Sequence, residues 1–279
     1  MVHYQPASIG MLIWVCALHC EAKPVIDFYR LKKSHDDNAF DLYRSDNMAC
    51  IISGIGKLAS AAASAWIAAR YEDAPSIAWI NLGIAGAANC ELGSIFALHQ
   101  VTDADTGQRY YPAPGAKSAL PGYACLTLSQ PSEDYREHQL YDMEASGFMH
   151  STLRFSSAEL TQCIKIISDN RQHKTGKDRP RISALIHRHI ELIDQQANNL
   201  LALNQEIAAL KSPAECWQQL TAMAHFSQTQ KNRLRVLWRY LMNRDLSSEQ
   251  LFREIGSCAS SKAIIETLEQ LSYRESEGL

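Results

Sequence analysis

The sequence lacks the signals of several common protein classes. Its 279 residues include 27 basic and 30 acidic side chains, a formal net charge of −3, so no excess charge recruits nucleic acid or an anionic membrane. The longest apolar run near the start, Met11 to Leu18, is too short to span a bilayer. It also lacks the basic flank and the small-residue cleavage site of a signal peptide. These absences favour a cytoplasmic protein.

The cysteines lack the spacing of metal or redox sites. None of the eight forms a CxxC pair, and nothing resembles zinc-ligand spacing. Several lie inside apolar runs, where a free thiol packs as a small hydrophobic side chain. We therefore expect reduced cysteines in the core, and we expect neither a metal nor any other cofactor.

Short apolar runs alternate with helical patterns over the first two-thirds of the chain, which predicts an α/β layered architecture. An apolar stripe from Ile182 to Leu210 predicts one long amphipathic helix. The other predicted elements are strands over residues 11–18, 48–53, 77–82, 94–102, 123–128 and 163–167, and helices over residues 21–31, 58–70 and 144–155.

The sequence after residue 210 is helical in character and has no strand signal. Ser212 and Glu215 form a capping-box pattern with Pro213 at the first helical position. We expect the apolar face of 231–244 to pack on the α/β domain. The chain is therefore divided into an α/β domain, residues 1–210, and an all-α extension, residues 211–279, with helices predicted over 213–225, 227–243, 248–255 and 260–271.

Two glycine-rich turns are predicted after strands. The first, SGIGKLA at 53–59, lacks the first glycine of a P-loop and the hydroxyl side chain that follows its lysine. It fits the dinucleotide pattern GxGxxA, with Glu72 or Asp73 at a suitable distance, and it equally fits a tight strand-to-helix turn. The second is GIAG at 83–86. Together the two turns indicate a ligand across the carboxyl ends of a parallel sheet.

Acidic residues lie beside two buried segments. Asp169 directly follows the predicted strand CIKIIS, although a helix cap or an Asx turn is a more common role for an aspartate there. The stretch YDMEASGF at 141–148 places Asp142 and Glu144 among packing residues, some small enough to let two elements approach closely. Either these acids begin a solvated helix, or a carboxylate here accepts hydrogen bonds from the hydroxyl groups of a substrate.

In order and approximate spacing, these segments resemble the purine nucleoside phosphorylase and methylthioadenosine/S-adenosylhomocysteine nucleosidase superfamily. The resemblance covers roughly residues 11–210 and implies a three-layer αβα sandwich around a mixed, twisted sheet, assembled as a homodimer or a larger homo-oligomer. The similar segments are ALHCEA at 17–22, ISGIGK at 52–57, NLGIAGA at 81–87, DAD at 103–105, DMEA at 142–145 and ISD at 167–169.

The resemblance also implies a reaction, cleavage of the N-glycosidic bond of a purine nucleoside. Asp169 would protonate the base, Glu144 would accept hydrogen bonds from the ribose hydroxyls, and Glu21 would orient or deprotonate the attacking water. Each role suits a carboxyl group in a partly dry crevice. Asp142 would act behind Glu144 or be solvated. The implied substrate-binding residues are Met143, Gly54, Gly83, Ala85, Gly86 and Ser168.

The chain departs from the family pattern in three places. Ile84 stands where phosphorylases of this family use a serine or threonine to hold phosphate, so water is the expected nucleophile. The segment 129–139 is short where the family supplies an aromatic residue that stacks on the base, and Tyr135 is a candidate for that role. The basic residues between 171 and 181 could cover an anionic group of the substrate, but a solvated loop is favoured.

We therefore expect a purine nucleosidase, an N-ribosyl hydrolase that uses water. One alternative is a non-catalytic nucleoside sensor or scaffold of the same fold, which would use the helical tail for a partner. Another is a nicotinamide-dinucleotide enzyme built on GIGKLA. The expected ligand is a small-molecule nucleoside, and neither nucleic acid nor a membrane is an expected partner. The base and the 5′ substituent stay undefined at this point.

Overall fold

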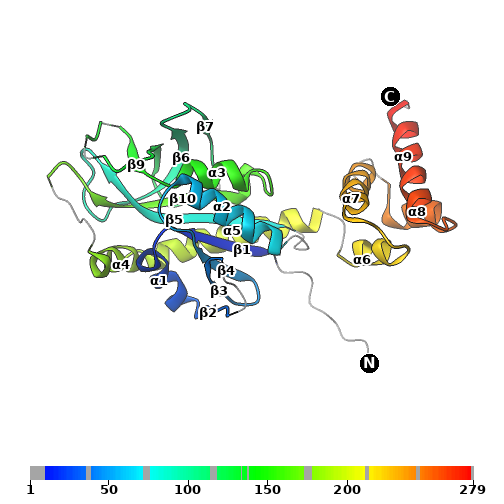
Figure 1. The fold of residues 1–279 in the computed structure, drawn as a ribbon, viewed down its shortest axis with the longest axis horizontal. Helices are drawn as coiled ribbons and strands as arrows, with labels where there is room; N and C mark the ends of the chain where they lie inside the picture. Colours follow the sequence, from blue (N-terminus) through cyan, green and yellow to red (C-terminus); the bar gives the residue numbers. More distant parts are fainter. Residues whose placement is uncertain are drawn as a thin grey trace. The chain divides into compact units, whose positions relative to one another are not determined.

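The computed structural model describes residues 10–35, 39–71, 76–113, 118–132, 134–136, 138–172, 178–210, 214–242 and 246–277. The chain divides into two compact units, Met1–Gln205 and Glu206–Leu279, and the sequence placed this division at residue 210. The first is an α/β unit and the second is helical (Figure 1). Within the described ranges, no helix is long and apolar enough to cross a bilayer.

The regular elements of the α/β unit follow the predicted alternation of strands and helices. Its strands are β1 (Met11–Cys16), β2 (Lys32–Lys33), β3 (Asp41–Arg44), β4 (Met48–Ile52), β5 (Ile77–Ala87), β6 (Ile95–Asp103), β7 (Arg109–Tyr110), β8 (Gly122–Thr127), β9 (Leu140–Asp142) and β10 (Thr161–Asp169). Its helices are α1 (His19–Phe28), α2 (Lys57–Arg70), α3 (Ala145–Thr152), α4 (Arg179–His187) and α5 (Ile190–Leu210), the last of which runs past the division between the units.

Two details of the predicted elements are wrong. The segment GIAG at 83–86 is not a turn, because it continues β5 and pairs with β10 as far as Gly86. The predicted long helix is interrupted after α4, where Arg188 is the C-cap and the His189 ring hydrogen-bonds to the carbonyl of Gly93 at 2.6 Å. Four short strands, β2, β3, β7 and β9, were not predicted from the sequence.

The strands form one mixed sheet, as predicted. Strands β4, β1, β5 and β10 run parallel and adjacent in this order. Beyond them, β10 pairs antiparallel with β6, β6 pairs parallel with β8, β8 pairs parallel with β9, and β9 pairs antiparallel with β5. The strands β5, β10, β6, β8 and β9 therefore close into a ring, which brings β9 and the start of α3 beside the carboxyl ends of β5 and β10.

Helices cover both faces of the sheet, giving the predicted αβα layers (Figure 1). On one face α2 packs on α3, and the contact requires Gly147, since a methyl group there would lie 1.8 Å from the carbonyl oxygen of Lys57. The prediction that small residues near Gly147 allow a close approach is confirmed. On the other face α1 packs on α4, and Tyr29 donates a hydrogen bond to Asp194 of α5 at 2.6 Å.

The helical unit has a hydrophobic core of its own. Its helices are α6 (Ala214–Ala222), α7 (Gln228–Met242), α8 (Ser248–Ile255) and α9 (Ser261–Glu277). Leu234, Trp238 and Leu241 of α7 are buried together with residues of α8 and α9, so the prediction that this apolar face packs on the α/β domain is wrong. Ser247 caps α8 through a capping box with Gln250. The capping box predicted at 212–215 begins outside the described residues.

Candidate active site

A cavity of about 190 Å³ opens where β1, β5 and β10 end. The three carboxyl groups expected to be catalytic lie on separate segments, and all three line this one cavity. The remaining lining includes the expected Met143, Ala85, Gly86 and Ser168, together with Ile84 and Asp142 and with Ala17, Leu18, Ile55, Leu128, Pro131, Ser132, Tyr135 and Tyr141.

Glu21 is buried in the first turn of α1, directly after β1. One carboxylate oxygen accepts the backbone N–H of Ile84 at 3.0 Å, and the other accepts that of Leu18 at 2.8 Å. Burial raises the pKa of Glu21, and these N–H donors and the nearby Lys165 only partly offset the rise. Glu21 is thus a fixed carboxyl group with an affinity for protons greater than usual, as a general base needs.

Glu144 lies at the N-terminal end of α3, where β9 delivers it to the cavity. Its oxygens accept the backbone N–H of Gly56 at 2.9 Å and that of Met143 at 3.3 Å. Burial raises the pKa of Glu144 to about 7, with the charges of Asp142 and Glu21 adding to the rise and Lys165 opposing it. The carboxyl group therefore changes charge near neutral pH and would be held ionised by a ligand that donates hydrogen bonds.

Asp169 is the last residue of β10 and is half-buried at the cavity wall. The hydroxyl group of Ser168 donates a hydrogen bond to its carboxylate. Because β10 runs parallel to β5, Asp169 is carried to the same edge of the sheet as Gly86, with which it is in register. The structure thus brings Asp169 beside the residues expected to bind substrate.

Gly54 and Gly83 were also expected at the site. Neither is among the described residues that line the cavity. Gly83 lies beneath Glu21: a methyl group there would be 2.9 Å from a Glu21 oxygen and 3.5 Å from Nζ of Lys165. Gly54 lies in the turn after β4, where its N–H donates to the carbonyl of Ala17. Each glycine thus contacts a residue that lines the cavity, Gly83 contacting Glu21 and Gly54 contacting Ala17. The acids expected in a dinucleotide site, Glu72 and Asp73, lie outside the described residues.

Lys165 is a buried charged residue beside the site that was not predicted from the sequence. It lies in the middle of β10, is 1% exposed, and forms an ion pair of 2.9 Å with Asp142. Burial opposes its charge, but Asp142 and Glu144 raise the pKa of Lys165 overall, so the ammonium form is retained. A lysine inside the apolar run CIKIIS was the available signal, because an unpaired ammonium is very costly to bury.

Asp142 is the partner of Lys165 and lies behind Glu144, the first of its two predicted roles, so the alternative of a solvated acid is wrong. It accepts hydrogen bonds from the Thr127 hydroxyl at 2.7 Å and from the backbone N–H of Ala145 at 2.8 Å. Burial acts to raise its pKa, yet the charge of Lys165 and these bonds lower the pKa of Asp142 overall. Asp142 thus stays ionised, fixes Lys165 and holds the first turn of α3 beside Glu144.

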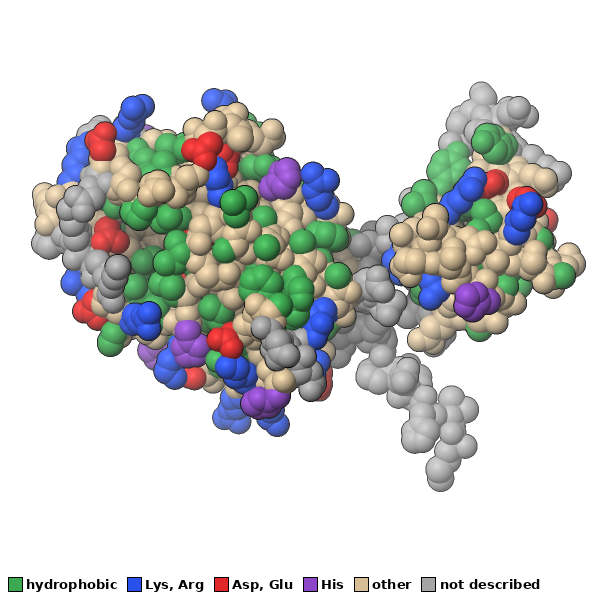
Figure 2. All heavy atoms as spheres, viewed as in Figure 1, with side chains coloured by type: hydrophobic (Ala, Val, Ile, Leu, Met, Phe, Trp, Pro, Cys, Tyr) green, Lys and Arg blue, Asp and Glu red, His purple; other side chains and the backbone are tan. Residues whose placement is uncertain are grey.

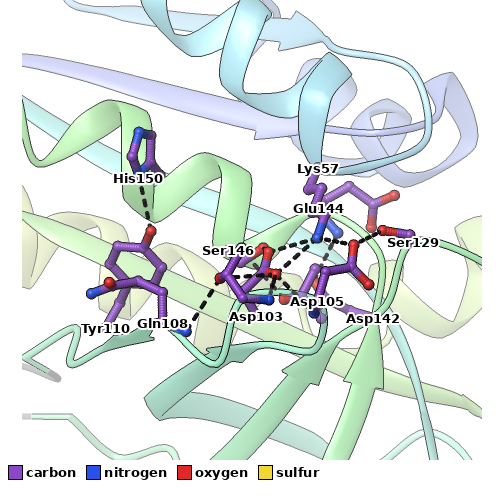
Figure 3. A network of polar contacts seen from close by, with 12 residues as sticks. Lys57, Asp103, Asp105, Gln108, Tyr110, Ser129, Asp142, Glu144, Ser146 and His150 are labelled. Carbon is purple, nitrogen blue, oxygen red and sulfur yellow. Dashed lines mark hydrogen bonds and ion pairs between the residues drawn. The ribbon is translucent and has the colours of Figure 1, made fainter.

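A second lysine network lies next to this one (Figure 3). Nζ of Lys57 pairs with Asp103 at 2.8 Å and with Asp105 at 2.6 Å, and Asp103 accepts the Ser146 hydroxyl at 2.7 Å. Figure 3 shows Lys57 descending from α2 toward Asp103 and Asp105, with Ser146 approaching from α3. The network therefore holds together three elements around the segment that presents Glu144.

Tyr135, the candidate stacking residue, lies in the cavity wall. Its ring lies against Gly86, where a methyl group would come within 2.5 Å of the ring, and its centroid is 5.2 Å from that of Tyr141. The short segment 129–139 therefore does place an aromatic ring at the cavity.

The described residues include no group of three histidine, cysteine or acidic side chains that could hold a metal ion. All eight cysteines are free thiols. Five of them, Cys16, Cys20, Cys50, Cys125 and Cys163, are buried.

Comparisons with known proteins identify the fold. No protein-family model matches the sequence, and no curated protein is similar to it at a significant level. Solved structures do match. A 5′-methylthioadenosine nucleosidase of Arabidopsis thaliana superimposes with a TM-score of 0.57 at 14% identity, over 70% of this chain and 97% of the plant chain. The protein has the nucleosidase fold.

Two further solved structures are similar to this chain, another nucleosidase and a futalosine hydrolase. An MTA/SAH nucleosidase of Colwellia psychrerythraea, in complex with adenine, gives a TM-score of 0.54 at 16% identity over 72% of this chain and 98% of its own. The futalosine hydrolase of Helicobacter pylori gives 0.53 at 10% identity over 70% and 98%. These matches cover nearly the whole of each relative and confirm the fold predicted from the sequence.

Proposed function

We propose that the protein hydrolyses the N-glycosidic bond of a purine nucleoside. The observation that carries the proposal is that Glu21, Glu144 and Asp169, from three separate segments, line one cavity in a nucleosidase fold. In the proposed reaction, water bonds to C1′ of the ribose and the C1′–N9 bond breaks. The bond pair leaves with the base, which takes up a proton, and the products are the free base and ribose.

Asp169 would donate the proton that lets the base leave. Its position at the end of β10, in register with Gly86 and in the wall of the same cavity as Tyr135, supports this role. Protonation of a leaving group by a positioned acid typically contributes about 10² to 10⁴ in rate.

Glu21 and Glu144 would act on the sugar side. Glu21 is held by two backbone N–H groups and has a raised pKa, so it can accept a proton from water as C1′ becomes positive. Glu144, once ionised, would accept hydrogen bonds from the 2′ and 3′ hydroxyls. The positive charge of the buried Lys165 offsets part of the repulsion between these neighbouring carboxylates, so that they can ionise before substrate binds.

Water is favoured over phosphate as the nucleophile by the environment of Ile84. Its apolar side chain lines the cavity, while its backbone N–H is already bonded to Glu21. Neither group offers a hydrogen bond to a phosphate oxygen, and the buried cation nearby is paired with Asp142. The proposed reaction is therefore hydrolysis rather than phosphorolysis.

Base release measured by chromatography tests the proposal. We expect the full chain to release free base from adenosine, inosine or 5′-methylthioadenosine in the absence of phosphate. Asp169→Asn should lower kcat by a factor of about 10² or more while leaving the thermal transition unchanged. A variant with full activity would show that another group is the acid, and dependence on phosphate would replace hydrolysis with phosphorolysis.

A nucleoside-binding protein without turnover is the second candidate. The departures from the family pattern at Ile84 and in the short segment 129–139 favour it, and the cavity of about 190 Å³ is below the roughly 300–1,000 Å³ of most small-molecule sites. The Tyr135 ring against Gly86 narrows the cavity further. This candidate predicts that nucleosides raise the thermal transition without release of base, so the same panel of compounds separates the two functions.

We also propose that the protein self-associates through α2. Leu58 is 83% exposed and Ile55 is 58% exposed, and Ala62, Ala65 and Ala69 extend this apolar face along the helix. In Figure 2 the middle of the α/β unit presents hydrophobic and uncharged atoms. Because Ile55 also lines the cavity, a second copy over this face would cover the cavity mouth. Free thiols throughout fit a reducing compartment such as the cytoplasm.

Sedimentation of the full chain tests this face. We expect a homodimer or larger homo-oligomer, and Leu58→Glu should shift it toward the monomer because a buried carboxylate opposes the contact. Lys23→Glu, on the exposed side of α1, is the matched control and should leave the oligomer intact. A wild-type protein that is monomeric at micromolar concentrations would contradict the proposed self-association.

A further inference from the structure

A second cavity adjoins the candidate active site on the far side of Leu18. It has a volume of about 690 Å³ and lies between α1 and α4. Leu18 lines both cavities, and Cys20 of the second is next in sequence to Glu21 of the first. We name this second cavity the α1/α4 groove; its lining also includes His19, Lys23, Pro24, Asp27, Arg179, Pro180, Ser183, Ala184 and His187.

The orientation proposed for the nucleoside directs its 5′ carbon toward this groove. The base end of the active-site cavity is formed by Asp169, Gly86 and Tyr135, and the sugar hydroxyls are assigned to Glu144. The rest of the lining includes Ala17, Ile55 and Leu18, and Leu18 also lines the α1/α4 groove. A 5′ substituent longer than a hydroxyl group would therefore pass Leu18 and enter the α1/α4 groove.

The two cavities differ in charge. Four carboxyl groups, Glu21, Asp142, Glu144 and Asp169, surround the place of the sugar against the single ammonium group of Lys165. This excess of negative charge suits a cationic transition state but repels an anionic substituent. An anion at the 5′ end would need positive charge farther out, beyond Leu18.

The α1/α4 groove supplies that charge. Arg179 is exposed at the start of α4 and makes no ion pair with any residue in the described part of the chain. Its charge reaches Cys20: burial and the neighbouring Glu21 raise the pKa of this thiol, and Arg179 opposes that rise. Lys23 is paired with Asp27 at 2.7 Å, which leaves Arg179 as the principal cation, with His19 and His187 beside it.

We propose that the α1/α4 groove binds an anionic 5′ extension of the purine nucleoside, of which one or more phosphate groups is the chemistry that an arginine fork fits best. The inference rests on the proposed function and names its substrate class. Hydrolysis then releases the free base and ribose 5-phosphate. A carboxylate-bearing extension shares the anionic chemistry and is separated from phosphate by the choice of compounds.

The test compares adenosine 5′-monophosphate with adenosine, 5′-methylthioadenosine and S-adenosylhomocysteine, by base release and by calorimetric binding to the Asp169→Asn variant. We expect the monophosphate to have the highest kcat/KM and the lowest Kd, with a preference over adenosine that weakens as salt is raised. Arg179→Glu should reduce this preference by about fivefold or more. Arg181→Glu makes the same change of charge on the same helix, outside the groove, and should leave it unchanged.

The outcomes separate the two proposals. If base is released but the monophosphate is no better than adenosine, hydrolysis stands and the anionic groove is wrong. If no compound loses its base, binding still decides: tighter binding of the monophosphate that Arg179→Glu removes and Arg181→Glu retains supports the groove. A preference for S-adenosylhomocysteine over the monophosphate would overturn the assignment to phosphate. Equal effects of the two variants would overturn a role for Arg179.

Discussion

Two lysines of the α/β unit pair with aspartates a short distance apart, and their surroundings give them different tasks. Lys165 and Asp142 are 1% and 0% exposed in their side chains. Lys57 is 16% exposed, and one of its two partners, Asp105, is 55% exposed. The buried pair cannot be hydrated if one member is lost, whereas Asp105 remains accessible to water and the less exposed Asp103 has further hydrogen-bond donors.

Both pairs hold the same short segment from different sides. Asp142 accepts the N–H of Ala145, and Asp103 accepts the hydroxyl of Ser146. Glu144, between β9 and α3, is thereby fixed at the cavity. The difference is that Lys165 also places positive charge among the carboxyl groups of the site, while the charge of Lys57 is taken up by Asp103 and Asp105. We therefore expect removal of Lys165 to affect stability and chemistry, and removal of Lys57 mainly stability.

Replacement of Lys165 should have the largest effect. Lys165→Met leaves the carboxylate of Asp142 buried and unpaired, and the free energy of unfolding should fall by about 3–5 kcal/mol. Activity should also fall, because Glu21 and Glu144 would ionise less readily without the cation. Urea denaturation and base release measure the two effects.

Matched variants separate the ion pair from packing. Lys165→Arg retains the charge and should recover part of the activity. The double variant Lys165→Met with Asp142→Asn removes both charges and should be more stable than Lys165→Met alone. A single variant that loses less than about 1 kcal/mol would show that the pair is not buried in solution.

The raised pKa of Glu144 predicts a pH dependence of stability. The folded protein holds this proton with a pKa of about 7 against an ordinary value of 4.5, so it binds more protons than the unfolded chain between these values. The free energy of unfolding should therefore fall as pH rises from about 4.5 to 7, by at most about 3 kcal/mol. In the same range kcat/KM should rise, because the proposed role of Glu144 needs the carboxylate.

Glu144→Gln tests the assignment of that titration. Its stability should vary less between pH 4.5 and 7 than that of the wild type, as measured by urea midpoints at several pH values. Glu21 has a pKa shifted in the same direction, so some dependence should remain. An unchanged profile would mean that another group titrates in this range.

The arrangement of strands and helices in the α/β unit was easier to predict from the sequence than the pairing of its buried charged side chains. Alternating apolar runs predicted a layered α/β architecture, the family resemblance implied the mixed sheet, and the residues that it singled out, Glu21, Glu144 and Asp169, line one cavity. The pairing of Asp142 with Lys165 could not be predicted, because it joins β9 and β10 through the closed ring of strands and depends on their register around β5. The continuation of β5 through its glycines was missed for a similar reason, since only pairing with β10 shows that they remain extended.

Replacement of Lys57 should have the smallest effect and completes the comparison of the two lysines. Lys57→Met leaves Asp103 bonded to the Ser146 hydroxyl and to the N–H groups of Asp105 and Thr106. These donors offset part of the loss at Asp103, which is 10% exposed, and water can hydrate Asp105, so the loss in free energy of unfolding should be about 1 kcal/mol. It should shrink further in about 1 M salt, unlike the loss caused by Lys165→Met, because accessible ion pairs are screened and buried ones are not. Parallel urea denaturation of both variants at low and high salt measures this contrast. If both variants lose the same free energy of unfolding with the same salt dependence, solvent accessibility does not distinguish the two lysines. Both would then act only by holding α3 in place.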